Sequence, residues 1–284
     1  MRNPTLHGSK AEAVVHQTWT ALGPYQEHAV LVGGLAVFAY AWHPDFAPLR
    51  ALLPLATVDA DLAITNPLEL ATAGDLSTQL QRAGLVRRDV VRHETAYTCF
   101  DFPPTNIALS SAYVEFLSPT DNLQVRDDEP QNGLRVHLSP HAWMLLEMPW
   151  TITHKDLVIR VAHPLAFAAQ KLLIRESRPL DKRSKDLADV IYVLGGFQRV
   201  LPTLFADLPT ICRAHPNGHH VREALDSLAY LCSGERPIGP REVASAYGHA
   251  PSDLQFTTVT QSVSIIADRI CAAWRSAKET GPTD

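Results

Sequence analysis

The spacing of apolar residues along the chain changes near residue 160. Before this point, short apolar runs alternate with polar residues at period two, as in the Ser-Ala-Tyr-Val-Glu-Phe-Leu run that ends at Leu117. Period two is typical of strands. Beyond Pro164, helical spacing takes over at Leu165, Ala168, Ala169, Leu172 and Leu173. We therefore predict an α+β protein, with a mixed β-sheet and flanking helices in residues 1–160 and an all-helical domain in residues 161–284.

Local signals predict where individual elements begin and end. Ser9 and Glu12 have the spacing of a capping box, so the first helix is expected over Ser9–Leu22. The apolar run Trp143–Met148 is a candidate short strand. In the helical half, a helix is expected over Arg183–Leu194, closed by two glycines, and a long helix over Val259–Ala277.

Two motifs in the first half carry candidate chemistry. Residues 30–37 read Val-Leu-Val-Gly-Gly-Leu-Ala-Val, which predicts a strand, a glycine turn and a helix. Residues 57–64 read Thr-Val-Asp-Ala-Asp-Leu-Ala-Ile, which predicts a strand. Because strand side chains alternate between faces, Asp59 and Asp61 point the same way. Two such carboxylates suit a hard divalent cation such as Mg²⁺.

Each motif also has a plain structural interpretation, as a strand-to-helix turn and as a pair of solvated carboxylates. Together they favour the transfer of a phosphoryl or nucleotidyl group. Adjacent glycines let backbone N–H groups approach a phosphate, and the following helix N-terminus favours negative charge. We therefore expect Gly33, Gly34 and Thr57 to bind nucleotide phosphates beside the carboxylates.

A two-metal site needs a third carboxylate, and Glu115 is the leading candidate. It lies between Val114 and Phe116 on a predicted strand that follows the Asp-x-Asp strand. Asp101, in Cys-Phe-Asp-Phe-Pro-Pro, is the rival. The structural alternative is that Glu115 is an ordinary exposed strand residue.

One lysine in the helical half stands among apolar neighbours. Lys171 is flanked by Ala169 and Leu172 on a largely apolar helix, and a lysine on an apolar face needs an anionic partner unless its head reaches solvent. Two acidic residues follow on the next predicted helix, Asp186 and Asp189. Asp186 either positions Lys171 or is a favourable charge in the first turn of its helix.

These motifs resemble a known group of enzymes. The glycine turn and the Asp-x-Asp strand, with Thr57 two residues before the first Asp, are similar to the nucleotidyltransferase superfamily that includes polymerase β. Within it they resemble the AbiEii/AbiGii-type toxin family, in which a longer linker separates the two motifs. A second region also resembles this family. It consists of a predicted helix that begins at Pro164 and carries Lys171, followed by Arg178 and by the run Lys185-Asp186-Leu187-Ala188-Asp189-Val190.

The resemblance implies a mechanism and partners. Asp59, Asp61 and Glu115 would hold two Mg²⁺ ions, Lys171 would reach the triphosphate of a bound NTP, and Asp189 would position Lys171 or the acceptor. It further implies a toxin-like role, with RNA such as tRNA ends as the acceptor and an antitoxin protein as a partner. Two departures from the family pattern stand out. Glu115 replaces the usual Asp, and Leu55 occupies the position of an Arg, for which Arg50 is the nearest substitute.

Composition limits the acceptor and the location. The 284 residues carry a net charge of −5, so any contact with nucleic acid needs a local basic patch. Basic residues that would form it are Arg87, Arg88, Arg92, Arg175, Arg178, Lys182, Arg183 and Lys185. No apolar run is long enough to span a bilayer, the N-terminus lacks the apolar core of a signal peptide, and the four cysteines are scattered, so a cytoplasmic location is expected.

Two alternatives remain at this level. A small-molecule nucleotidyltransferase of the antibiotic-modifying type would present a narrow acidic acceptor face rather than a basic one. A catalytically degenerate binding module is the other, and Leu55 and Glu115 are the features that favour it.

Overall fold

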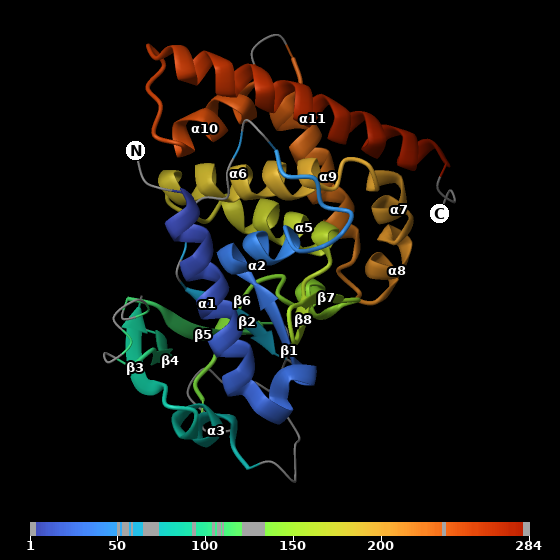
Figure 1. Ribbon diagram of the computed structural model, residues 1–284. Helices are drawn as coiled ribbons and strands as arrows, with labels where there is room; N and C mark the ends of the chain where they lie inside the picture. Colours follow the sequence, from blue (N-terminus) through green and yellow to red (C-terminus); the bar gives the residue numbers. More distant parts are fainter. Residues whose placement is uncertain are drawn as a thin grey trace. The chain divides into compact units, whose positions relative to one another are not determined.

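The computed structural model describes residues 4–49, 52, 57, 59–64, 74–92, 95–103, 106, 109, 111–120, 134–234 and 237–280. Two compact units are distinguished. Unit 1 comprises Met1–Trp42 and Ala56–Ala162, and unit 2 comprises His43–Leu55 and His163–Asp284. A mixed sheet with flanking helices occupies the N-terminal half and the C-terminal region is helical, so the predicted α+β class is confirmed (Figure 1).

The described strands of unit 1 form one mixed sheet. They are β1 (Ala29–Val32), β2 (Ala60–Ile64), β3 (Val86–Arg92), β4 (Thr95–Asp101), β5 (Tyr113–Pro119), β6 (His137–Ser139), β7 (Trp150–His154) and β8 (Leu157–Val161). Their order across the sheet is β3-β4-β5-β2-β1-β8-β7, and β6 pairs with β5. The pairs β2 with β5, β1 with β8 and β5 with β6 are parallel, and the others are antiparallel.

Strand register lines up residues from four strands at the centre of this sheet. Val32 on β1 pairs with Asp61 on β2, and Asp61 pairs with Glu115 on β5. Glu115 in turn pairs with Cys99 on β4. Paired residues of neighbouring strands project to the same face, so Asp61 and Glu115 share one face of the sheet.

Four α-helices and a short 3₁₀ helix accompany the sheet within the described part of unit 1. They are α1 (Pro4–Leu22), η1 (Gly23–His28), α2 (Gly33–Tyr40), α3 (Leu76–Arg82) and α4 (Trp143–Leu146). Helices α1 and α2 pack on β2 and β8, and α2 also packs on β1. Large side chains of the two helices are buried in this packing, among them Trp19 of α1 and Leu35 of α2. The Tyr40 hydroxyl, at the end of α2, donates a hydrogen bond to the Ala162 carbonyl at 2.8 Å.

Two sequence predictions in unit 1 are wrong. The first helix begins at Pro4, so Ser9 lies inside the helix and the Ser9–Glu12 pair does not cap its start. Proline is favoured in the first helical turn, which explains the earlier start. The run Trp143–Met148 forms the short helix α4 rather than a strand, with Trp143, Met144 and Leu145 all buried. A short apolar run of this kind does not distinguish a buried helix from a strand by periodicity.

Unit 2 is helical in its described residues. Its helices are α5 (Pro164–Arg175), α6 (Leu180–Gly196), α7 (Leu201–Ala206), α8 (Leu208–Arg213), α9 (His219–Cys232), α10 (Ile238–Ala246) and α11 (Leu254–Thr280). Helix α5 packs against α6 and α9, and α10 and α11 both contact α6 and α9 (Figure 1). No helix in the described residues of either unit is long and apolar enough to cross a membrane.

Helix α6 begins earlier than the sequence predicts. It starts at Leu180 rather than Arg183, which moves Asp186 into the second turn. The interpretation of Asp186 as a first-turn helix charge is therefore wrong; Asp181 occupies that position. Near the end of α6, a Cβ at Gly196 would lie 2.1 Å from the ring of Phe46. The absence of a side chain at Gly196 therefore allows residues 43–49 to pack against this helix.

Candidate functional site

The glycine turn after β1 lies directly against the carboxylate of Asp61. Gly33 has φ +61, in the left-handed region that favours glycine. A Cβ at this position would lie 1.8 Å from Asp61 Oδ2, closer than any non-bonded contact allows. Both the backbone conformation and the approach of Asp61 therefore require glycine at position 33.

The second glycine is required by a different neighbour. A Cβ at Gly34 would lie 2.5 Å from Cγ2 and 3.0 Å from Oγ1 of Thr57. Thr57 itself is half-buried. The structure thus brings together the three residues expected to bind phosphate, Gly33, Gly34 and Thr57, at the start of α2.

The candidate carboxylates gather on the sheet face beside this turn. Asp61 and Glu115 are paired in register, and Asp59 lies two residues before Asp61, on the same face. Glu115 is buried, with 6% of its surface exposed, and its Oε1 lies 3.0 Å from His137 Nδ1. The interpretation of Glu115 as an exposed strand residue is therefore wrong.

A tyrosine completes the acidic face. Tyr113 lies two residues before Glu115 on β5 and hydrogen-bonds to Asp59. Burial raises the pKa of the Tyr113 phenol above its usual value, and the nearby charges of Asp59, Glu115 and Asp61 raise it further. The phenol therefore keeps its proton at neutral pH and donates a hydrogen bond to the Asp59 carboxylate.

Asp101, the other candidate for the third metal ligand, already has a cationic partner. Asp101 accepts two hydrogen bonds from Arg88, from Nε at 2.7 Å and from Nη2 at 2.9 Å. The Arg88 guanidinium also lies 5.9 Å from the centre of the Tyr113 ring. A bidentate arginine pair satisfies both carboxylate oxygens, which leaves Asp101 poorly suited to a metal.

The carboxylate oxygens of Asp59, Asp61 and Glu115 are the ligand type that a hard divalent cation prefers. They lie farther apart than the ligands of a single bound ion. In the described part of the chain, three ligand atoms all within 4.8 Å of one another are found for His219, His220 and Glu223, which are partly or fully exposed at the start of α9. Asp59, Asp61 and Glu115 do not form so tight a set. A two-metal site spreads its ligands around ions about 3.5–4 Å apart, and carboxylates repel one another without cations. The oxygen donors, and the close approach of Asp61 to the glycine turn, fit such a site.

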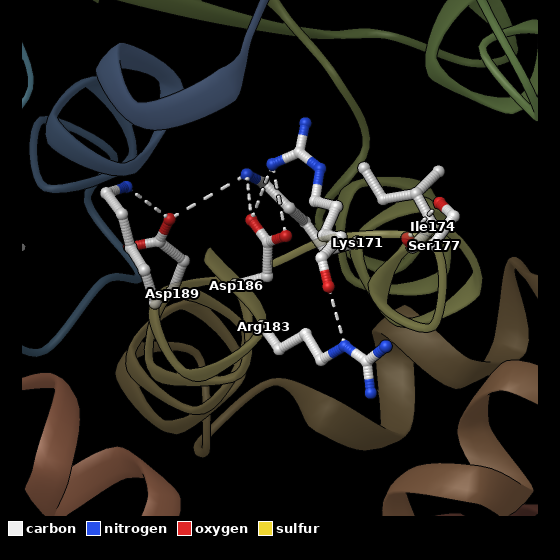
Figure 2. Close-up of polar contacts among 8 residues, drawn as sticks. Lys171, Ile174, Ser177, Arg183, Asp186 and Asp189 are labelled. Carbon is white, nitrogen blue, oxygen red and sulfur yellow. Dashed lines mark hydrogen bonds and ion pairs between the residues drawn. The ribbon is translucent and has the colours of Figure 1, made fainter. Parts of the chain in front are cut away.

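Unit 2 holds a second group of charged side chains, shown in Figure 2. Lys171 is buried, and its Nζ lies 2.6 Å from Asp186 Oδ1 and 3.9 Å from Asp189 Oδ2. Arg178 also bonds to Asp186, and Lys185 bonds to Asp189 at 2.8 Å. The anionic partner that the sequence demands for Lys171 is therefore Asp186, and the alternative of a lysine head in solvent is wrong.

Most basic side chains expected to form a nucleic-acid patch have acidic partners. Arg87 lies near Asp89, Arg88 pairs with Asp101, and Arg175 is buried with Glu242 and Glu176. Arg183 donates to the backbone carbonyls of Glu176 and Arg178. Lys182 is exposed. The side chain of Arg92, and the whole of Arg50 and Leu55, lie outside the described residues.

Sequence reasoning missed His137 and the role of Tyr113. Tyr113 had an available signal, because it lies two residues from Glu115 and must share its face. His137 had none, since it reaches Glu115 through the pairing of β5 with β6, which nothing in the local sequence specifies.

Comparison with known proteins places these observations in a family. No match was found among curated proteins or among solved structures. A family model described as Nucleotidyltransferase matches residues 11–209, which is more than half of the chain. The matched region contains the glycine turn, the three carboxylates and the charged pair of helices α5 and α6. The chain therefore belongs to the nucleotidyltransferase family.

Proposed function

We propose that this protein is a Mg²⁺-dependent nucleotidyltransferase that moves a nucleoside monophosphate from an NTP to an acceptor hydroxyl. Family membership supports the reaction class and the NTP substrate. The observation that carries the proposal is the contact between the glycine turn and Asp61, where Asp61 Oδ2 fills the space of the missing Cβ at Gly33. This contact places a carboxylate beside backbone N–H groups suited to phosphate.

The roles of the residues follow from their positions. Asp59, Asp61 and Glu115 would hold two Mg²⁺ ions, which supply charge stabilisation for the phosphoryl oxygens and activate the attacking hydroxyl. Gly33 and Gly34 present backbone N–H groups to the β- and γ-phosphates, and Thr57 adds its hydroxyl. His137 orients the Glu115 carboxylate through the 3.0 Å contact. Catalysis is then mainly positioning and charge stabilisation, with pyrophosphate as the product.

The acceptor is proposed from the resemblance to AbiEii/AbiGii-type toxins. RNA, such as tRNA ends, is the acceptor, the role is that of a toxin, and an antitoxin protein is the partner. The proposed location is the cytoplasm. In the same resemblance, Lys171 binds the triphosphate, and Asp189 positions Lys171 or the acceptor.

One observation favours a small-molecule acceptor instead. Two arginines of the sheet have acidic partners: Arg88 pairs with Asp101, and Arg87 with Asp89. A paired arginine contributes little attraction to a polyanion such as RNA. A small acceptor needs no such attraction, so this pairing supports the antibiotic-modifying type of reaction.

The test is transfer of label from α-³²P NTPs to bulk cellular RNA in the presence of Mg²⁺. Label on RNA that is lost in Asp59→Asn/Asp61→Asn, by a factor of at least about 10³, supports RNA transfer. The matched control is Asp156→Asn/Asp268→Asn, which removes the same charge from two exposed positions and should keep full activity.

Other outcomes separate the alternatives. Absence of label on RNA, with Mg²⁺-dependent pyrophosphate release on addition of small metabolites, supports the small-molecule reaction. Folded protein that releases no pyrophosphate under either condition, yet binds NTP, contradicts the proposed reaction and supports a catalytically degenerate binding module.

A further inference from the structure

The first turns of α9 carry two histidines and a glutamate whose ligand atoms lie close together. His219, His220 and Glu223 each offer one nitrogen or oxygen atom, and these three atoms all lie within 4.8 Å of one another. In the part of the chain that the structure describes, they are the one group of three or more histidine, cysteine or acidic residues with this property. They belong to unit 2, whereas the carboxylates proposed to hold Mg²⁺ belong to unit 1.

Helical spacing explains why the three side chains converge. Glu223 lies four residues after His219 and three residues after His220, and residues at both spacings are neighbours on a helix surface. His220 Nδ1 lies 2.8 Å from Glu223 Oε2, and the centres of the two imidazole rings are 4.1 Å apart. The carboxylate is therefore within reach of both rings.

Two imidazoles and a carboxylate form a ligand set for a borderline transition ion such as Zn²⁺. Zn²⁺ bonds these atoms at about 2.0–2.2 Å, which places neighbouring tetrahedral ligands about 3.4 Å apart. Modest rotations about side-chain bonds are enough to bring the three atoms from their present separations to this spacing. Mg²⁺ prefers oxygen ligands, so this set selects against the ion proposed for unit 1.

The backbone that carries the three residues is held in place. The opposite face of α9 is buried through Val221, Leu225 and Leu228. Just before the helix, a Cβ at Gly218 would lie 1.8 Å from the Cys212 carbonyl oxygen, so the start of α9 packs closely against the end of α8. Ligands on a rigid element of this kind need only side-chain movement to bind an ion.

A surface ion pair is the alternative explanation of this group. His220 and Glu223 have the spacing of an ordinary helix pair, which adds little to stability when it is exposed to solvent. His219 has no part in that pair, yet its ligand atom lies near both of the others. The contribution of His219 therefore distinguishes a metal site from a surface pair.

We propose that His219, His220 and Glu223 bind one Zn²⁺ or a similar borderline transition ion, with solvent at the remaining coordination position. The side chains of His220 and Glu223 are 32% and 60% exposed, so an ion reaches them directly from solvent. Three protein ligands and one open position differ from the closed set of four that holds a structural zinc ion. The bound ion is therefore exchangeable, and its site is independent of the reaction proposed above.

The test is Zn²⁺ binding to the full chain, measured by calorimetry. The chain carries Asp59→Asn/Asp61→Asn, which removes two carboxylates of unit 1 as competing ligands. We expect one saturable Zn²⁺ site and no Mg²⁺ binding of comparable affinity. His219→Ala and Glu223→Gln should each weaken Zn²⁺ binding at least about tenfold, because a ligand is lost.

A histidine on another helix provides the matched control. His16 on α1 also lies beside a carboxylate, with its Nε2 3.5 Å from Asp156 Oδ1, but it belongs to no group of three ligands in the described residues. His16→Ala should therefore change the Zn²⁺ affinity by less than about threefold. Circular dichroism first establishes that each variant folds.

Thermal unfolding provides a second measurement. An ion that binds only the folded chain raises the Tm, so Zn²⁺ should raise the Tm of the parent chain and of His16→Ala but not that of His219→Ala. A surface pair of His220 and Glu223 predicts instead that His219→Ala behaves as the parent chain does, with or without Zn²⁺.

Three results would overturn the proposal. One is the absence of saturable Zn²⁺ binding. Another is a folded His219→Ala variant that binds Zn²⁺ as tightly as the parent chain. The third is equal weakening in His16→Ala, which would indicate diffuse binding by the histidines of the chain. Nucleotidyl transfer is measured separately with Mg²⁺, so a failure of the proposed reaction and a failure of the zinc site give different results.

Discussion

Both units of this protein hold a pair of aspartates at short spacing, and their surroundings differ. In unit 1, Asp59 and Asp61 lie on a half-exposed sheet face where Tyr113 and His137 are hydrogen-bonding neighbours of the acidic group. In unit 2, Asp186 and Asp189 are buried on α6 with cations already beside them. The unit 1 carboxylates thus suit a cation from outside, whereas the unit 2 carboxylates already have cationic side chains as partners. Acidic spacing alone does not distinguish these roles.

The largest expected effect is on stability in unit 2. Asp186→Ala should lower the free energy of unfolding by about 3–5 kcal/mol, because it leaves Lys171 buried without its closest counter-ion. Asp61→Asn should leave stability unchanged or raise it slightly, since it removes one of several neighbouring like charges. Urea unfolding of both variants measures the difference.

Similar losses of unfolding free energy in Asp186→Ala and Asp61→Asn would contradict the contrast between the two pairs of aspartates. Equal losses would mean that the unit 1 carboxylates are also structural, and that the glycine turn needs the Asp61 charge to fold. A variant Asp186→Asn helps interpretation, because it retains the shape of the side chain and an acceptor oxygen, and should lose less stability than Asp186→Ala.

A smaller effect distinguishes the two candidates for the third metal ligand. Glu115→Gln should weaken Mn²⁺ binding about a hundredfold, or about 2.7 kcal/mol, because a ligand or its close support is lost. Asp101→Asn removes the same charge from the next strand and should weaken it less than about threefold, since Arg88 already neutralises Asp101. Electron paramagnetic resonance of free Mn²⁺ gives both affinities, and a reversed order would identify Asp101 as the ligand.

Much of unit 1 follows from local sequence, because its signals are local. A strand, two glycines and a helix were predicted from residues 30–37, and the structure has β1 ending at Val32 and α2 beginning at Gly33. The alternation that placed Asp59 and Asp61 on one face is a property of any strand. The apolar positions around Glu115 likewise predicted a strand, which is observed as β5.

Long-range pairings could not be predicted in this way. That Asp61 pairs with Glu115 depends on which strands become neighbours in the sheet. The partner of Lys171 lies fifteen residues away on another helix, and its identity depends on how α5 packs on α6. The start of α6 at Leu180 was missed because Pro179 and the charges that follow resemble a loop, although proline often precedes or opens a helix.

The smallest of these effects tests the contact between the glycine turn and Asp61. Gly33→Ala and Gly84→Ala both place a side chain at positive φ, +61 and +92, which costs roughly 1–2 kcal/mol of stability in each case. Only at Gly33 would the new Cβ meet another group, Asp61 Oδ2, whereas nothing lies within 4 Å at Gly84. Gly33→Ala must therefore displace the carboxylate, and we expect about tenfold weaker Mn²⁺ binding, or about 1.4 kcal/mol, with no change for Gly84→Ala.

Equal Mn²⁺ affinity in the two variants, both folded, would show that metal binding does not depend on the position of Asp61 against the turn. The contact between Asp61 and Gly33 would then no longer support the proposed function.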